Sequence, residues 1–262
     1  MIPEIRIYDR EFGHAKSMSG EQVPKLMKWR REGPPTSICF FTDRELEKAR
    51  DVDCEFKVAW LIEPRATIGD SAELFNCVLT YNRKALDDHP RNLFYPHGGC
   101  WIPDLECRDH PKTGHVSMIS SSKSGLPGYD LRHQVFNNCK SVDFYGTICG
   151  KPMISKVPAI APYHYSIVIE SLCIEDYFTE KLIDCFALGT IPIYWGTKNI
   201  GKYFDMGGII QVSSLEEIEA VIENLAEPSA EMLSAVRKNM LLANHYKCVE
   251  DWIFSNHQHL SP

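Results

Sequence analysis

Residues 177–196 read YFTEKLIDCFALGTIPIYWG, with a polar start, an apolar helical pattern, a glycine and a short apolar run. Thr179 is a suitable N-cap residue, and Gly189 suits the position just beyond a helix C-terminus. The apolar side chains between them recur with the period of one helix face, and IPIYW has the length and composition of a buried strand. The stretch therefore predicts a helix from Thr179 to Leu188 followed by a parallel strand.

The segment before this helix supplies the strand that completes a βα unit. Residues 165–171, YSIVIES, are almost entirely apolar until they end in Glu170 and Ser171, as expected of a parallel strand buried on both faces. Glu180 and Lys181 would then occupy the first helical turn beyond the carboxyl end of that strand. Open α/β sheets bind ligands at this edge, and free N–H groups at a helix start attract phosphate. In a simpler interpretation, the glutamate only favours the helix dipole and the lysine is solvated.

Short apolar runs continue through the whole chain and predict an α/β protein. In the first hundred residues these runs are EIRIYD, TSICFFTD, FKVAWLIEP, CVLTYN and NLFYPHGG, and later ones are VSMISSS, SVDFYG, IPIYWG and GIIQV. The longer connections between them indicate βα units and mainly parallel sheets. The polar, turn-rich segment 103–114, PDLECRDHPKTG, is the best candidate for a linker. We therefore expect two domains, residues 1–110 and 111–262, with a C-terminal helix that could cross back to the first.

Composition limits the classes of function. The chain has 262 residues, 44% of them hydrophobic and 24% charged, which is enough for two α/β domains with separate cores. Its net charge of −7 argues against nucleic acid or an acidic membrane surface as the main partner. The ten cysteines form no CxxC pair, so we expect reduced thiols. Since neither a signal peptide nor a membrane-spanning run is visible, the sequence predicts a soluble, cytoplasmic protein.

The sequence around the opening stretch resembles glycosyltransferase family 10, the α1,3/4-fucosyltransferases. In that family a strand ending in Glu-Asn precedes Y-(V/F)-T-E-K, an apolar helix and G-T-(I/V)-P-(I/V), and here the chain reads YSIVIESLCIEDYFTEKLIDCFALGTIPIYWG. Ser171 stands where the family usually has Asn. The segments SMISSSKSGLPGYDLRHQVFNNC, VDFYG and KVAWLIEPRA are similar to further family segments. The resemblance is closer to the short microbial enzymes, because the cysteine-linked C-terminal motif of animal members is missing.

The resemblance implies a GT-B-like fold, in which two Rossmann-like domains with mainly parallel sheets face a cleft. Residues 1–110 would form the acceptor-side domain, and residues 111–262 would bind the nucleotide sugar. The implied reaction is inverting transfer of fucose from GDP-fucose to a glycan hydroxyl, so the expected partners are a GDP-sugar donor and a carbohydrate acceptor. Two alternatives stay open: a transferase that uses another GDP-sugar, and a non-catalytic protein that binds sugar nucleotides.

Five residues take donor-binding roles by this resemblance: Arg132, Ser171, Tyr177, Glu180 and Lys181. Arginine offers a bidentate fork and lysine a point charge, so these cations would stabilise the leaving diphosphate without a metal or other cofactor. Glu180 would accept hydrogen bonds from ribose hydroxyls, and Tyr177 would pack on the base or bond to it. Without the family, Arg132 is interpreted as a surface helix arginine and Tyr177 as a residue packed in a loop.

Glu63 ends the apolar run FKVAWLI and falls on the position of the family's proposed general base. A carboxylate there would take the proton of the acceptor hydroxyl as it attacks the anomeric carbon. The alternative is a strand-end glutamate turned to solvent. Asp51 and Asp53 form an Asp-x-Asp pair, but its polar loop context disfavours a metal site. His97 and Trp101 flank a glycine pair and suit either an acceptor wall or a strand-end turn.

Overall fold

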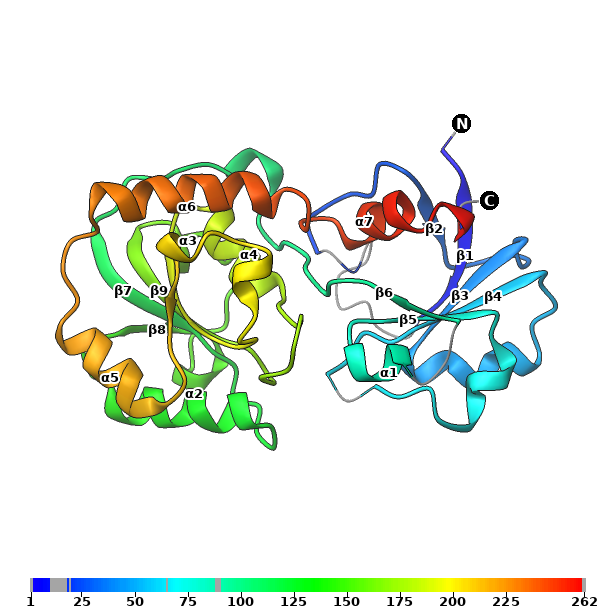
Figure 1. Cartoon of the computed structure of the whole chain (residues 1–262), viewed down its shortest axis with the longest axis horizontal. Coiled ribbons are helices and arrows are strands. Elements are labelled where there is room, and N and C mark those ends of the chain that lie inside the picture. The colour runs from blue at the N-terminus through cyan, green and yellow to red at the C-terminus, as the bar shows by residue number, and fades with distance from the viewer. Residues whose placement is uncertain (1, 10–17, 19, 65, 88–90, 261–262) are drawn as a thin grey trace. The chain divides into compact units, whose positions relative to one another are not determined.

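The computed structural model describes residues 2–9, 18, 20–64, 66–87 and 91–260 (Figure 1). The chain divides into two compact units, one made of residues 1–99 with 248–262 and the other of residues 100–247. The boundary lies at residue 99 rather than at 110, because the segment that follows packs into the second unit. Cys100 and Ile102 are both fully buried in that unit's core.

The first unit contains a six-stranded parallel sheet with the order β2-β1-β3-β4-β5-β6. All the apolar runs of the first hundred residues form strands, whereas the three-residue edge strand with the sequence KWR is not predicted by its pattern. The short helix α1 (Arg83–Asp87) leads into the last strand. The strands are β1 (Glu4–Tyr8), β2 (Lys28–Arg30), β3 (Ile38–Thr42), β4 (Phe56–Trp60), β5 (Cys77–Thr80) and β6 (Asn92–Phe94).

The C-terminal helix α7 (Val249–Asn256) belongs to this first unit. Its Phe254 ring lies 5.9 Å from the Phe40 ring and 6.5 Å from the Trp29 ring, measured between centroids. Trp29 Nε1 also donates a hydrogen bond of 3.1 Å to Glu250 Oε1. The helix therefore completes an aromatic core that begins on the strands of the first hundred residues.

The second unit contains a five-stranded parallel sheet with the order β11-β10-β9-β7-β8. β7 comes first in the chain but lies between β8 and β9 in the sheet. The chain therefore adds β8 on one side of β7 and the later strands on the other, so the strand order reverses between β7 and β9. Open α/β sheets bind ligands at the carboxyl ends of the strands at such a switch point. The strands are β7 (Gly114–Ile119), β8 (Asp143–Tyr145), β9 (Tyr163–Ile169), β10 (Ile191–Trp195) and β11 (Ile210–Gln211).

Helices cover both faces of this second sheet (Figure 1). Helices α2 (Pro127–Asn138) and α5 (Leu215–Glu223) pack against one face, where Leu131 and Ile218 enter the core. Helices α3 (Val157–Ile160), α4 (Glu180–Ala187) and α6 (Ala230–Ala243) contribute to the core on the other face. Both units are thus α/β layers built on parallel sheets, as the apolar runs predict.

Helix α4 begins as the sequence predicts. Thr179 is its N-cap, and the Thr179 hydroxyl oxygen accepts a hydrogen bond of 3.3 Å from the Lys181 backbone N–H. Gly189, just beyond the helix, has a φ of +66°, a left-handed conformation that glycine adopts without strain. The polar start of α4 is therefore fixed directly beyond the carboxyl end of β9.

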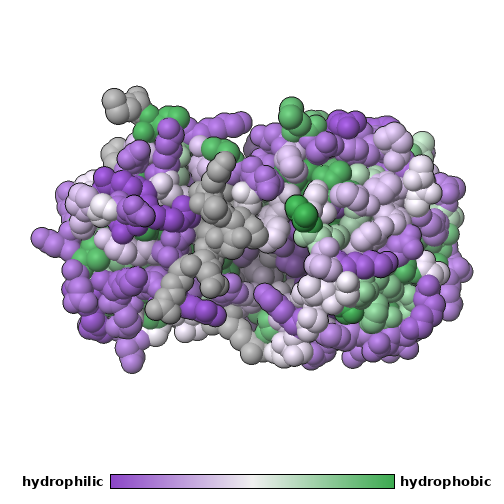
Figure 2. Space-filling view, turned by 180° about the vertical axis from the view of Figure 1, so that it is seen from behind, coloured by the Kyte–Doolittle hydropathy of each residue, from purple (hydrophilic) through white to green (hydrophobic). Residues whose placement is uncertain are grey.

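The protein surface drawn in Figure 2 is mainly hydrophilic, and its hydrophobic residues occur in small separate groups. Within the described ranges, no helix combines the length and the apolar character needed to cross a membrane. All ten cysteines lie within the described residues and are free thiols there.

Candidate functional site

A pocket of about 170 Å³ lies in the second unit at the switch point between β7 and β9. Residues at the carboxyl ends of both strands line it, together with residues of α2 and α4 and with Lys156 and Ile160 at the two ends of α3. Three of the lining side chains are cations and two are carboxylates, so charges of both signs line the pocket. The polar lining residues are Ser120, Ser121, Arg132, Lys156, Ser166, Glu180, Lys181 and Asp184.

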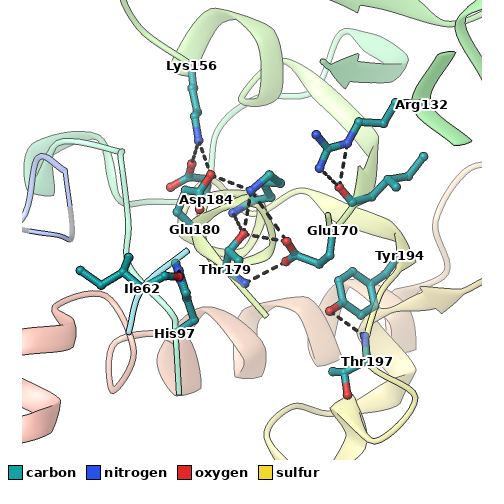
Figure 3. A network of polar contacts seen from close by, with 12 residues as sticks. Ile62, His97, Arg132, Lys156, Glu170, Thr179, Glu180, Asp184, Tyr194 and Thr197 are labelled. Atoms are coloured by element: carbon teal, nitrogen blue, oxygen red, sulfur yellow. Dashed lines mark hydrogen bonds and ion pairs between the residues drawn. The ribbon is translucent and has the colours of Figure 1, made fainter. Parts of the chain in front are cut away.

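Glu170 ties the end of β9 to the start of α4 (Figure 3). Its carboxylate accepts hydrogen bonds from the backbone N–H and the hydroxyl of Thr179, both at 2.8 Å. Lys181 Nζ lies 2.9 Å from Thr179 Oγ1 and 3.8 Å from Glu170 Oε2. Burial raises the pKa of Glu170, whereas Lys181 and the two Thr179 donors act to lower it. These contacts hold Lys181 at the pocket wall.

Arg132 is a buried residue of α2 and lies behind the same strand end. Its Nε donates a hydrogen bond of 3.0 Å to the Ile169 carbonyl oxygen, and its Nη2 donates to the same atom. Burial lowers the pKa of Arg132, and the nearby Glu170 carboxylate opposes this effect. The surface-arginine interpretation is therefore wrong, because only 5% of the residue is exposed. Two of the five N–H donors of the guanidinium serve this carbonyl, and the side chain also lines the pocket.

Gly128 allows α2 to approach the strand end closely. Its backbone N–H donates a hydrogen bond of 3.2 Å to the Ser171 carbonyl oxygen. A Cβ atom at this position would lie 1.8 Å from the Glu170 carbonyl oxygen, so any other residue would force α2 and the strand end apart. Only glycine fits here, and the close approach brings Arg132, one turn later, to the end of β9. The sequence offers no clear signal of this role, because a glycine after a proline usually indicates a turn.

Glu180 and Asp184 lie one turn apart on α4 and are both close to Lys156 (Figure 3). Lys156 Nζ lies 2.7 Å from Asp184 Oδ2 and 3.7 Å from Glu180 Oε1. Asp184 Oδ1 accepts a hydrogen bond of 2.7 Å from the Trp101 backbone N–H, and Lys156 Nζ lies 4.4 Å from the centre of the Trp101 ring. On the other side, Lys181 Nζ lies 3.0 Å from Glu180 Oε1. These side chains form one connected charge network.

Ser171 and Tyr177 lie in the connection between β9 and α4 and are 4% and 2% exposed. Neither belongs to the set of residues that line the pocket described above. The connection is fixed by Asp176, which has a φ of +59° and accepts hydrogen bonds from Asn199 Nδ2 at 2.9 Å and Tyr203 OH at 2.7 Å. The structure thus brings three of the five predicted donor residues to one pocket and buries the other two in the adjoining connection. Their roles stay predictions.

Glu63, in the first unit, follows β4, and its side chain is exposed. The backbone around it is held firmly, since Asp43 accepts the N–H groups of Ile62 at 2.8 Å and Glu63 at 3.1 Å. Tyr81 OH donates to the Glu63 carbonyl oxygen at 2.8 Å, and His97 Nε2 donates to the Ile62 carbonyl oxygen at 3.1 Å. Burial raises the pKa of Asp43, against the effect of the two N–H donors. A fixed strand end therefore carries a solvent-accessible carboxylate.

Sequence reasoning missed Lys156 and Asp184. Asp184 carries a signal, because it interrupts the apolar pattern LI-CFA of α4, and a charge on a buried helix face requires a partner. Lys156 lies 28 residues away, and nothing in its local sequence indicates the pairing. Asp51 and Asp53 are exposed, and the described residues contain no group of three or more His, Cys, Asp or Glu placed to hold a metal ion.

The second unit matches a known protein family. Residues 111–239 match the model of glycosyltransferase family 10 (fucosyltransferase), C-terminal part. The alpha-(1,3)-fucosyltransferase FucT of Helicobacter pylori is 25% identical over 118 residues, which cover 44% of this chain and 24% of that protein. The alpha-(1,4)-fucosyltransferase of Arabidopsis thaliana is 31% identical over 72 residues, which cover 26% of this chain and 18% of that protein. The matches thus span about a quarter or less of the length of these relatives.

Solved glycosyltransferase structures share the fold over most of the chain. A crystal structure of an alpha1,3-fucosyltransferase with GDP-fucose has a TM-score of 0.60 and 17% identity, covering 91% of this chain and 83% of that one. Anabaena Alr3699/HepE in complex with UDP-glucose has a TM-score of 0.61 and 10% identity, covering 85% and 78%. The predicted GT-B-like α/β fold is therefore confirmed.

Proposed function

Because residues 111–239 carry the C-terminal domain of glycosyltransferase family 10, we propose that this chain is an inverting transferase that moves fucose from GDP-fucose to a glycan hydroxyl. The observation that carries the proposal is the pocket at the β7/β9 switch point, where Arg132 and Lys181 lie within the matched segment. Paired cations at a strand edge suit a nucleoside diphosphate. The alpha1,3-fucosyltransferase solved with GDP-fucose shares this fold.

The donor would lie with its diphosphate between Arg132 and Lys181. Lys181 lies in the first turn of α4, where the positive end of the helix dipole adds to its charge. These cations act on the charge that grows on the diphosphate as the bond to the sugar breaks, so they lower the barrier as well as bind the donor. Glu180 would accept hydrogen bonds from the ribose hydroxyls. We propose that this charge arrangement works without a metal ion.

Glu63 is the proposed general base. Its exposed carboxylate on a rigid backbone can accept the proton of an acceptor hydroxyl, and direct attack of that hydroxyl on the anomeric carbon inverts the configuration. The donor residues do not by themselves select the sugar ring. Transfer from another GDP-sugar is therefore the second candidate, and binding without turnover is the third.

Calorimetry with GDP, UDP and CMP, followed by donor hydrolysis assays with several GDP-sugars, tests the proposal. We expect GDP to bind far more tightly than UDP or CMP, and GDP-fucose to be hydrolysed slowly when no acceptor is present. A control variant is Lys238→Met. Lys238 lies on α6 outside the residues that line the pocket, and the substitution removes its 2.8 Å ion pair with Asp205. Equal affinity for GDP and UDP would contradict donor recognition. GDP binding without hydrolysis or transfer would favour the non-catalytic alternative.

A further inference from the structure

The side chains next to the pocket form a connected series from Trp101 through Asp184, Lys156 and Glu180 to Lys181. We propose that Lys156, held by Asp184, is a positioning residue that orients the Glu180 carboxylate toward the ribose of the donor. The inference rests on the proposed function, because it explains how the residue assigned to the ribose is kept in place.

Stability alone does not account for the Lys156–Asp184 pair. The Asp184 side chain is fully buried, and that of Lys156 is 16% exposed. Burial opposes the charge on Lys156, but Asp184 and Glu180 outweigh it and raise the Lys156 pKa. A buried ion pair gains little over well-packed apolar side chains of the same volume, because both charges lose their hydration. Such a pair in a pocket wall therefore indicates a role in the site.

The geometry connects this pair to Glu180. Glu180 and Asp184 lie on the same face of α4, four residues apart, where like charges repel. Lys156 Nζ lies between the two carboxylates, at 3.7 and 2.7 Å, and offsets this repulsion. The face of the Trp101 ring, 4.4 Å from Nζ, restricts the ammonium group on a further side. Without Lys156, the Glu180 carboxylate would turn away from Asp184 and lose its orientation.

Lys156 is also the cation best suited to keep Glu180 in place while a donor is bound. Lys181, at 3.0 Å from Glu180, has a side chain that is 30% exposed and is the group proposed to contact the diphosphate. Lys156 is less exposed and is held by Asp184, so a ligand does not need to displace it. A carboxylate held in this way would discriminate strongly against a nucleotide that lacks a ribose hydroxyl, since it would lose its hydrogen-bond donor.

The test compares the affinities of GDP and 2′-deoxy-GDP by calorimetry in the full chain and in Lys156→Met. The parent should prefer GDP by about tenfold or more, the value of one hydrogen bond to a charged group. In Lys156→Met this preference should fall to about twofold or less, and Lys156→Arg should restore part of it. Lys238→Met should keep both affinities and the preference. A purely structural role of Lys156 would lower both affinities in proportion and leave the preference unchanged, which would overturn the inference.

A second variant deals with the risk that Lys156→Met does not fold, since it leaves Asp184 buried without its cation. Lys156→Met/Asp184→Asn removes both charges, and the asparagine oxygen can still accept the Trp101 N–H. We expect this variant to melt close to the parent temperature and still to lose preference, because Glu180 no longer has the Lys156 ammonium group 3.7 Å away even though the repulsion from Asp184 is also gone. If it retains the parent's preference, the inference is wrong although the proposed function stands. A parent chain that binds no GDP would overturn both.

Discussion

The substitution Gly128→Ala tests how closely helix α2 must approach the end of β9. In an ordinary helix this change would stabilise the protein by about 0.5–1 kcal/mol, because glycine loses more conformational entropy on folding. Here the added Cβ would lie 1.8 Å from the Glu170 carbonyl oxygen, whereas real Cβ contacts are at least 3.0 Å, so the helix and the strand end must separate by about 1.2 Å. Overpacking of this kind costs about 1–3 kcal/mol, so the net effect should be destabilising.

The same shift should weaken donor binding, because it moves Arg132 away from the Ile169 carbonyl and the pocket wall. A weakened hydrogen bond from the Arg132 cation costs about 1.5–3 kcal/mol, so we expect about a tenfold or greater loss in GDP affinity. Urea unfolding gives the stability, and calorimetry gives the affinity of the folded variant. The control is Gln134→Ala, at an exposed position of the same helix. A Gly128→Ala variant as stable as the parent, with normal GDP affinity, would refute the close-approach argument.

Four further predictions follow from the site and its surroundings. Glu63→Gln should lower turnover by about 10²–10⁴-fold with almost unchanged GDP affinity by calorimetry, and parent-like turnover would remove the base assignment. EDTA should leave most transfer activity in place, whereas full loss restored by Mn²⁺ would argue for a metal-dependent reaction. Lys112→Met should lower the free energy of unfolding, measured in urea, by about 3 kcal/mol. The reason is that Lys112 Nζ donates hydrogen bonds of 2.8–2.9 Å to the Ala161 and Leu188 carbonyls and the Thr190 hydroxyl. A stability equal to the parent's would contradict this. The contact with Cys100 lowers the pKa of the Cys107 thiol to about 7, against the effect of burial, so the reactive thiolate is present above that pH. The rate of iodoacetamide labelling of Cys107, followed by mass spectrometry, should therefore rise with pH with a midpoint near 7. A midpoint near that of ordinary thiols would contradict the assignment.

Most strands could be predicted from the sequence because parallel strands buried on both faces must be continuously apolar. The runs that became β4 and β9 show this clearly, and Thr179 and Gly189 mark the ends of α4 through well-understood capping preferences. The edge strand β2 has the sequence KWR and carries no such pattern, so its pairing with β1 is a tertiary effect. Local periodicity of apolar residues indicates which face of a helix or strand is buried. An edge strand such as β2 buries little apolar surface, so it need not show this periodicity.

Local sequence patterns could not predict the domain boundary or the residues that hold the side chains of the pocket in place. The segment 103–114 looks like a linker because its sequence is polar and rich in turn residues, yet Cys100 and Ile102 just before it are fully buried, and Lys112 within it donates hydrogen bonds to the Ala161 and Leu188 carbonyls. Arg132 required the family resemblance, since its own helix gives no sign that it is buried. The pairing of Lys156 with Asp184 joins residues 28 positions apart, and the sequence shows at most that Asp184 needs a partner. Contacts between residues far apart in the sequence are therefore the part of the site that sequence patterns could not predict.

The division of the chain into units has a consequence for its synthesis. The second unit is continuous in sequence and is complete at residue 247, but the first requires residues 248–262, whose helix α7 packs on Trp29 and Phe40. A nascent chain emerges from the ribosome N-terminal end first, and domains generally fold in that order. The strands of the first unit therefore leave this aromatic surface uncovered until α7 has emerged. Of these two units, the one whose strands come first in the sequence is thus expected to fold after the other.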